Sequence, residues 1–518
     1  MKLRSIDERL LMVGVLVLAL VVRLIILLSG AVTFHSDEAI VGLMARHITQ
    51  GQPIPIFFYG QSYMGSLDAL FVALSFKLFG ESVASIRLIQ TLLYLAFVAT
   101  TMLIAWRLTA DRRVLLGAGL LVAVASPTLV VYTTASLGGY NELLVIGNLL
   151  LLAGWELSQQ PRAWRWWLAI GALTGLGWWT HGLIATYTLP VALIALWALL
   201  KHKSLPQVAA AFVAFMLCSA PWWVYNLTHD WETLRFLLGG FGGVANPAHM
   251  PIPDKLIGLG FIGWPGLVGA RYSWQSTLWT PLGWAVLIVW IAILVPSLLR
   301  ALRTPDQRGE RYMWGMVAGF TAIFILSSFG ADATGRYLLP LVAPLSILLA
   351  AQLRGRLGTV VLATLLVWQL VSVGNAVANQ PPGLTPQFDP ITDIPNTDDD
   401  RVLAFLQREG LTRGYATYWV AYRLAFLSHE QVTLSPLLPY KADLSIAGPE
   451  RYPPYTEAAQ RADQIALVTA KHPALDAAIE AGLRKLGINN WQREQIGDYV
   501  IYYRFPPSVT PHALGFDY

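Results

Sequence analysis

Apolar runs long enough to cross a lipid bilayer dominate the chain. A transmembrane helix needs about 20 predominantly apolar residues. Such runs occur near 10–29, 84–106, 114–134, 140–157, 165–180, 182–200, 206–225, 278–298, 312–329, 337–352 and 357–376. Only 13% of the residues are charged and 55% are hydrophobic, whereas a soluble domain carries about a quarter charged residues. We therefore predict an α-helical polytopic membrane protein with about eleven transmembrane helices.

Short basic clusters between the apolar runs predict the orientation in the membrane. If the N-terminus is cytoplasmic, sixteen Lys and Arg residues fall on the inner side and seven on the outer side. This bias follows the positive-inside rule only if 165–200 forms two helices. We expect a multi-pass protein of a cell membrane, and the absence of large outer insertions is more typical of a bacterial one. The net charge of +5 is dispersed, so the pattern argues against nucleic-acid binding.

Two outer segments interrupt the predicted transmembrane domain, which covers residues 1–376. The first outer loop, 30–83, contains two stretches with helical spacing, Ala39–Ile48 and Leu67–Phe79. We expect both to be amphipathic helices that lie in the membrane interface. The second segment, 226–277, is rich in Gly, Pro and Trp, and we expect irregular structure with short helices.

A soluble composition begins after Pro381-Pro382 and defines a second domain, 377–518. The pattern predicts helices at Val402–Glu409 and Leu475–Leu486 and strands at Gly414–Trp419, Ile465–Thr469 and Tyr499–Tyr503. Alternation of helix and strand indicates a small extracytoplasmic α/β domain. Asp398-Asp399-Asp400 fits an acidic helix start better than a metal cluster.

An Asp37-Glu38 pair follows the first apolar run within a few residues. Burial of two carboxylates in lipid is expensive, so they should face water, a cavity or a substrate. One interpretation is a general base for a substrate with a lipid tail. The other is an acidic N-cap, made by Ser36 or Asp37, for the helix that begins at Ala39. The two interpretations are compatible.

Arg336 and Tyr337 open a late apolar run at its outer end, in the sequence Arg-Tyr-Leu-Leu-Pro-Leu. A guanidinium group at this place is suited to hold a phosphate, because its fork of N–H groups matches two oxygens and its charge is permanent. The alternatives are a snorkelling arginine at the lipid headgroups or a pair with Asp332.

Further candidates for substrate binding lie in the first outer loop and at outer helix ends. Tyr59, Gln61 and Tyr63 suit a sugar or prenyl-phosphate pocket, and they would equally anchor the loop at the interface. Glu142 and His181 could bind substrate or metal, although a lone histidine at a helix end is more often structural.

Two features bear on helix packing alone. Arg23, within the first apolar run, needs a partner or an aqueous cavity, and pairing with a neighbouring helix is the favoured interpretation. The G-x-x-x-G patterns at Gly171–Gly175 and Gly315–Gly319 are typical of helices that pack closely.

The order and sidedness of these motifs resemble the GT-C superfamily of membrane glycosyltransferases. The resemblance covers roughly residues 1–376 and is strongest to bacterial members of families 39 and 83, relatives of protein O-mannosyltransferases and of the aminoarabinose transferase of lipid A. It implies a polyprenyl-phosphate sugar donor, an inverting reaction on the outer face, and Asp37 as the catalytic base. Some relatives carry an acidic-basic pair where this chain has Gln61-Ser62, which transfers more of the phosphate binding to Arg336.

The resemblance leaves several assignments open. Glu38 would orient the acceptor or bind a divalent cation together with Asp37, and no other cofactor is expected. The acceptor is a protein, a lipid or a glycan. A lipid or sugar transporter or flippase would place ionisable residues near the membrane midplane and show repeated halves, and a non-catalytic membrane assembly protein is the other alternative. The sequence contains no P-loop, HExxH or GxSxG motif.

Overall fold

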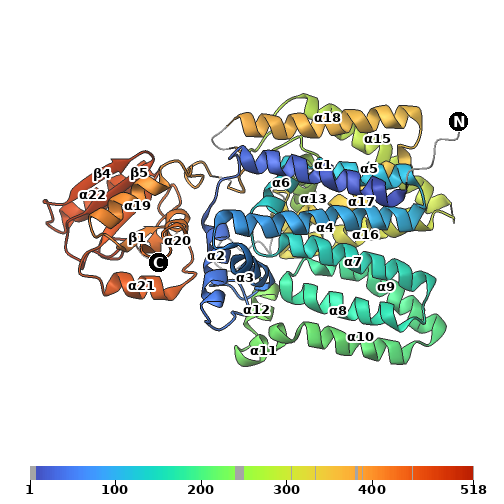
Figure 1. Cartoon of the computed structure of the whole chain (residues 1–518), viewed down its shortest axis with the longest axis horizontal. Coiled ribbons are helices and arrows are strands. Elements are labelled where there is room, and N and C mark those ends of the chain that lie inside the picture. The colour runs from blue at the N-terminus through green and yellow to red at the C-terminus, as the bar shows by residue number, and fades with distance from the viewer. Residues whose placement is uncertain are drawn as a thin grey trace.

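The computed structural model describes residues 7–239, 250–304, 306–332, 334–379, 383–387, 389–445 and 447–516. They form a bundle of helices joined at one end to a smaller sheet-containing domain (Figure 1). Glu8 pairs with Arg112 at one end of the first helix, and Ala31 bonds to Leu384 beyond its other end. The first helix therefore begins at the end of the bundle remote from the sheet.

Helices occupy all eleven predicted spans. The helical part consists of α1 (Glu8–Leu28), α2 (Ser36–Thr49), α3 (Leu67–Phe79), α4 (Val83–Thr109), α5 (Arg112–Ala123), α6 (Pro127–Thr134), α7 (Tyr140–Gln159), α8 (Trp164–Thr180), α9 (Ile184–His202), α10 (Leu205–Cys218), α11 (Ala220–Thr228), α12 (Glu232–Gly239), α13 (Ile252–Gly258), the π-helix η2 (Leu259–Gly263), α14 (Trp264–Leu267), α15 (Leu282–Arg303), α16 (Arg308–Leu326), the 3₁₀ helices η3 (Ser328–Ala331) and η4 (Arg336–Leu341), α17 (Val342–Gln352) and α18 (Arg356–Ala378).

By length and composition, five of the described helices can cross a membrane: α1, α4, α9, α15 and α18. The number is up to seven if each of two bent pairs counts as one span. The bends measure 71° between α5 and α6 and 64° between α10 and α11, and a proline lies in the first turn after each break. The count of about eleven thus stays a prediction, while the split of 165–200 into two helices is confirmed.

The first outer loop forms the two expected helices, but α2 differs from the prediction. Residues 38–47 of α2 are buried on every side, because α2 packs against α3 and against a helix of the C-terminal domain. Gly42 permits this approach, since a Cβ there would lie 2.5 Å from the Phe426 ring. Its charged and polar residues Arg46 and His47 are buried and bind Glu430 of the C-terminal domain. α2 is therefore a layer between the bundle and the C-terminal domain.

Arg23 attaches α1 to the short helix α6. Its guanidinium donates to Thr133 Oγ1 at 2.6 Å and to the Val130 carbonyl at 3.2 Å, and it lies 4.1 Å from the centroid of the Tyr94 ring. The favoured interpretation as a helix-helix contact is confirmed.

One of the two G-x-x-x-G patterns mediates close packing. A Cβ at Gly171 would lie 2.0 Å from the Ala211 carbonyl oxygen, and one at Gly175 would lie 2.4 Å from that of Phe215. α8 and α10 thus touch through their backbones. The second pattern makes no such backbone contact at Gly315, because no atom comes within 4 Å of a Cβ placed there.

The C-terminal domain is the predicted α/β unit. Its elements are α19 (Asp399–Arg408), β1 (Arg413–Thr417), α20 (Tyr418–Leu427), β2 (Thr433–Leu438), α21 (Pro453–Gln460), β3 (Ala466–Ala470), α22 (Pro473–Lys485), β4 (Gln492–Ile496) and β5 (Tyr499–Tyr503). The strand order is β2-β1-β3-β5-β4, in which β1 runs parallel to β2 and β3, and β5 antiparallel to β3 and β4.

Both faces of the sheet are covered. α19 and α20 pack on one face and α21 and α22 on the other. The alternating side chains of β5 accordingly enter two separate cores. Sequence patterns located β1, β3, β5, α19 and α22 but missed the remaining elements, and they extended β1 into Tyr418 and Trp419, where α20 begins. Asp399 lies at the predicted acidic helix start and pairs with Arg423.

The C-terminal domain holds the chain segment that precedes α2. The backbone N–H of Phe34 donates to Asn396 Oδ1 at 2.8 Å, and Asn396 Nδ2 donates back to the Phe34 carbonyl at 2.9 Å. The Leu384 N–H donates to the Ala31 carbonyl at 2.8 Å. The start of α2 is therefore fixed by residues more than three hundred positions away in the sequence.

Candidate active site

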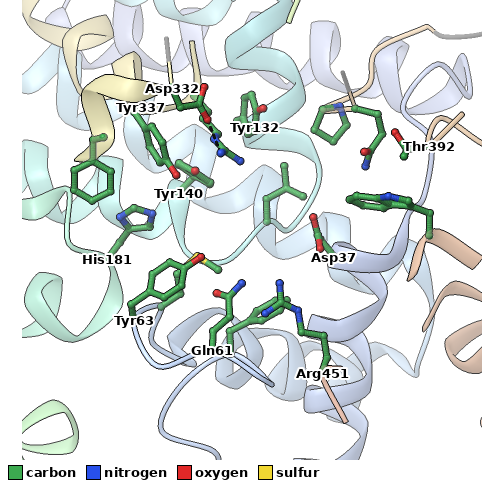
Figure 2. A pocket seen from close by; sticks show the side chains of 18 of the residues that line it. Asp37, Gln61, Tyr63, Tyr132, Tyr140, His181, Asp332, Tyr337, Thr392 and Arg451 are labelled. Carbon is green, nitrogen blue, oxygen red and sulfur yellow. Dashed lines mark ion pairs between the residues drawn. The ribbon is translucent and has the colours of Figure 1, made fainter. Parts of the chain in front are cut away.

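A cavity of about 490 Å³ lies where the bundle meets the C-terminal domain. Figure 2 shows its walls, which come from α2, the first outer loop, α6, the start of α7, the α8–α9 connection, η4 and the C-terminal domain. Of the predicted site residues, the cavity wall includes Asp37, Gln61, Tyr63, His181, Arg336 and Tyr337.

Asp37 reaches this cavity from the first turn of α2. The helix is capped by His35, whose Nδ1 accepts from the Asp37 N–H at 3.2 Å, so the cap is neither Ser36 nor Asp37. The carboxylate of Asp37 is thus free of a capping role. It is half-buried and accepts a hydrogen bond from the Tyr418 hydroxyl at 2.5 Å.

Glu38 does not face the cavity, which corrects its assignment beside Asp37. Its side chain is fully buried and accepts from Arg87 of α4 at both oxygens, at 3.0 Å and 2.9 Å. Successive residues of a helix point about 100° apart, and the bidentate pair satisfies the buried charge. Because Arg87 occupies both oxygens, Glu38 is not placed to share a divalent cation with Asp37.

Arg336 enters the cavity at the start of η4. Gly335 precedes it with φ of 120°, a left-handed backbone that glycine adopts without strain. The Arg336 guanidinium forms an ion pair with Asp332 and lies 4.7 Å from the centroid of the Tyr337 ring. Its Nε is buried and has no hydrogen-bond acceptor within the described part of the chain. The expected pair with Asp332 therefore exists and still leaves donor capacity.

The loop that presents Arg336 is held from two sides. Arg271 donates to the Thr334 carbonyl at 2.9 Å, and Thr334 donates through N–H and Oγ1 to Asp332. Burial raises the pKa of Asp332, but Arg336 and the Thr334 donors outweigh burial and lower it overall. Asp332 is therefore an anion at neutral pH, and its charge orients Arg336.

The first outer loop contributes Gln61 and Tyr63. With its amide oxygen facing Arg451, Gln61 accepts from that guanidinium at 2.8 Å and 2.9 Å. Tyr63 stacks on Phe236 with ring centroids 4.6 Å apart. Tyr59 is outside the cavity wall: its hydroxyl bonds to His47 at 2.9 Å and its ring stacks on Tyr452. Tyr59 thus joins the loop to the C-terminal domain.

Of the two candidates His181 and Glu142, only His181 lines the cavity. His181 lies in the connection between α8 and α9, where its Nδ1 accepts from the Leu183 N–H at 3.2 Å. Burial, reinforced by Arg336, lowers the pKa of His181 to about 4, so the ring is neutral at pH 7. Glu142 lies outside the cavity wall and is buried next to Asp68, which accepts from Gln90 at 2.8 Å.

Sequence reasoning missed the contribution of the C-terminal domain. The cavity wall includes Pro386, Gln387, Asp389, Thr392, Trp419, Tyr440, Lys441 and Arg451, and Figure 2 shows Arg451 on the same side as Asp37. It also missed Tyr132 of α6. No local motif marks these residues, because their proximity to Asp37 arises only from packing of the two domains.

Metal-ligand clusters are absent from the described ranges: no three His, Cys, Asp or Glu side chains gather there. Asp398-Asp399-Asp400 likewise forms no such group, and Asp399 is engaged by Arg423 at 2.9 Å.

Comparison with known proteins shows which fold the chain has. Residues 67–225 match the family described as dolichyl-phosphate-mannose-protein mannosyltransferase. The structure resembles ArnT from Cupriavidus metallidurans bound to undecaprenyl phosphate, with a TM-score of 0.54 and 15% identity over 95% of this chain and 98% of that one. The chain has the GT-C fold.

Other solved structures agree with the GT-C assignment. ArnT in the apo state matches with a TM-score of 0.56 and 14% identity over 96% of this chain and 99% of that one. The oligosaccharyltransferase AglB from Archaeoglobus fulgidus, in complex with an inhibitory peptide and a dolichol-phosphate, matches with a TM-score of 0.51 and 12% identity over 89% and 69%. A search of curated protein sequences gives no match. The GT-C likeness to ArnT extends through the C-terminal domain, because almost the whole chain is covered.

Proposed function

We propose that this GT-C protein is an inverting glycosyltransferase that moves a sugar from a polyprenyl phosphate to an acceptor hydroxyl on the outer face of a cell membrane. The sugar is a hexose or a pentose. The observation that carries the proposal is that Asp37 and Arg336 line one cavity, at the end of the bundle that joins the C-terminal domain. A base and a phosphate-binding cation are the two groups that this reaction requires.

The reaction follows from these two groups. The Asp37 carboxylate takes the proton of the acceptor hydroxyl while that oxygen forms a bond to the anomeric carbon. The bond between this carbon and the phosphate oxygen breaks, and its electron pair leaves with the polyprenyl phosphate. Attack from the face opposite the leaving group inverts the anomeric centre. The leaving phosphate gains negative charge, which Arg336 stabilises.

A lipid-phosphate donor is also supported by the ligands bound to two proteins of similar fold. The ArnT crystal structure contains undecaprenyl phosphate, and the AglB structure is a complex with an inhibitory peptide and a dolichol-phosphate. In this chain the cavity wall combines Arg336 with the aromatic rings of Tyr63, Tyr132 and Tyr337, a composition suited to a sugar phosphate. We propose a cytoplasmic N-terminus and an extracytoplasmic C-terminal domain. Because the donor sugar is already linked to a lipid phosphate, the reaction on that side needs no nucleotide.

Asp37→Asn tests the assignment of the base. The protein is reconstituted in nanodiscs and supplied with the lipid-linked sugar identified from its co-purifying lipids. Loss of the base should lower kcat by about 10²–10⁴, while undecaprenyl phosphate still binds, as measured by quenching of tryptophan fluorescence. Asp443→Asn, which changes an exposed turn of the C-terminal domain, is the control. If the Asp37→Asn variant turns over its substrate at the wild-type rate, the proposal is wrong.

A further inference from the structure

Two hydrogen bonds clamp the start of α2 to the start of α20. The Ser36 hydroxyl donates to the backbone carbonyl of Tyr418 at 2.6 Å. The Tyr418 hydroxyl donates in the other direction, to Asp37 Oδ1 at 2.5 Å. Neighbouring residues of α2 therefore hold both the backbone and the side-chain tip of one tyrosine in the C-terminal domain. This arrangement fixes the position of the tyrosine hydroxyl relative to the Asp37 carboxylate.

Packing leaves the Tyr418 side chain little freedom. The residue is 3% exposed, and its ring makes edge contacts with Trp419 and Tyr422. Gly448 lies against its base, since a Cβ at Gly448 would come within 2.2 Å of the Tyr418 Cβ. A side chain locked in this way delivers its hydroxyl in one orientation.

Arg451 lies behind the Tyr418 hydroxyl. Its Nε donates to Tyr418 Oη at 3.3 Å, and its Nη1 donates to the Gly60 carbonyl at 3.1 Å. Arg451 forms no salt bridge with a carboxylate in the described ranges. Its positive charge therefore polarises the Tyr418 hydroxyl, which strengthens the hydrogen bond to the carboxylate. Burial raises the pKa of Tyr418 well above its usual value, so the hydroxyl keeps its proton.

We propose that Tyr418 is a positioning residue for the reaction, acting through Asp37, and that Arg451 supports it. This inference rests on the proposed function. Tyr418 occupies one carboxylate oxygen and leaves the other for the proton of the acceptor hydroxyl. The proton of Tyr418 stays on its oxygen throughout, and Asp37 alone changes protonation state.

Through Tyr418, the C-terminal domain becomes part of the catalytic centre. Asp37 belongs to the bundle, whereas the group that orients it belongs to a domain whose first strand begins at Arg413. The Phe34–Asn396 bonds maintain this contact on the adjacent side. The base is thus correctly oriented only when the two domains are joined.

Tyr418→Phe removes the hydroxyl and keeps the ring. Loss of a hydrogen bond to a charged group should reduce kcat roughly 10- to 100-fold, with the KM for the lipid donor changed less than about 2-fold. The other polar groups near Asp37 are His35, Tyr63, Tyr132, Tyr440 and Arg451, and all remain in this variant. A fall in kcat therefore reports the loss of the Tyr418 hydroxyl alone.

Tyr455→Phe is the matched control. Tyr455 also belongs to the C-terminal domain and donates to a carboxylate, Glu430, at 2.7 Å, but it lies outside the cavity wall. This variant should keep the wild-type kcat and KM. If Tyr418→Phe unfolds, which thermal unfolding and undecaprenyl phosphate binding would show, Gly448→Ala provides the second route. The added methyl group displaces Tyr418 while its hydroxyl is retained, and kcat should again fall at least about 10-fold.

The outcomes separate this inference from the proposed function. If Asp37→Asn abolishes turnover and folded Tyr418→Phe keeps the wild-type kcat, the role of Tyr418 is wrong and the glycosyltransferase assignment stands. If Asp37→Asn keeps full turnover, both are wrong. A kcat loss in Tyr418→Phe with an equally large rise in the KM for the lipid donor would also overturn the inference, because a merely structural tyrosine would disturb the whole cavity.

Discussion

Asp37 and Glu38 are adjacent in the sequence, yet their carboxylates lie in different environments. Asp37 lines the cavity and accepts from Tyr418, whereas Glu38 is fully buried in a bidentate pair with Arg87. The first turn of α2 thus carries one acid toward the substrate and one into the protein. The division predicts that the two acids respond differently to the same substitution.

Glu38→Gln should destabilise the fold without removing the chemistry. The change leaves the Arg87 guanidinium, with 11% of its side chain exposed, without its counter-charge. Removal of one partner from a buried ion pair costs about 3–5 kcal/mol. Denaturant unfolding in nanodiscs should show this loss, and kcat per folded molecule should stay within about 3-fold of the wild type.

The double variant Glu38→Met with Arg87→Met provides the control for this stability prediction. Replacement of both charges by apolar groups should recover much of the free energy of unfolding, because no uncompensated charge is left buried. A normally stable Glu38→Gln protein that has lost turnover would contradict the division between the two acids.

His35 should make the stability of the fold dependent on pH. Burial lowers the pKa of His35, an effect that Asp37 and Glu38 oppose only in part, and its Nδ1 caps α2 in the unprotonated form. Below about pH 6.5 the unfolded chain binds a proton that the folded chain rejects. The free energy of unfolding should therefore fall as pH drops from 7 to 5, by at most about 1.4 kcal/mol per pH unit.

His35→Asn isolates this effect, because asparagine is a good N-cap and does not titrate. The difference in unfolding free energy between wild type and His35→Asn should change between pH 7 and pH 5, in favour of the variant. If the difference is the same at both pH values, the cap does not titrate in this range.

Local sequence patterns were sufficient to locate most helices and the part of the site that the bundle contributes, but not the part from the C-terminal domain. Apolar runs and α-helical spacing depend on neighbouring residues, so they identified α1, α4 and both helices of the first outer loop. They also placed Asp37 and Arg336, because both lie at the ends of apolar runs. The membrane-interface assignment of α2 was wrong because its cover, α20, lies some 380 residues further along the chain.

The partners of Asp37 could not be predicted for the same physical reason. Tyr418 is separated from Asp37 by 381 positions, and in the sequence it reads as the end of a strand. Its role depends on how the sheet domain packs on α2, which no periodicity encodes. The pairing of Glu38 with Arg87 is likewise a tertiary contact, although a buried acid requires some cationic partner.

Gly171→Ala should destabilise the bundle, whereas Gly315→Ala should not. A methyl group at Gly171 would lie 2.0 Å from the Ala211 carbonyl oxygen, so α8 and α10 would have to separate. Such overpacking costs about 1–3 kcal/mol. Gly315 has open space around its Cβ position, and alanine is the better helix former by about 1 kcal/mol. Thermal unfolding should therefore fall for the first variant and stay level or rise for the second. Equal effects of the two changes would refute the backbone contact.

Arg336→Gln should weaken the binding of undecaprenyl phosphate, because the variant loses the guanidinium whose Nε has no acceptor in the described chain. Charge-assisted hydrogen bonds to a phosphate contribute about 1.5–3 kcal/mol, so Kd should rise roughly 10- to 100-fold. Asp332→Asn should act in the opposite direction and lower Kd several-fold, since it frees Arg336 from its ion pair and removes a negative charge near the bound phosphate. Arg113→Gln, at the remote end of the bundle where Arg113 bonds to the Arg354 carbonyl, is the control and should leave Kd unchanged. Binding is measured by tryptophan fluorescence at several salt concentrations, and an unaltered Kd for Arg336→Gln would remove Arg336 from the phosphate site.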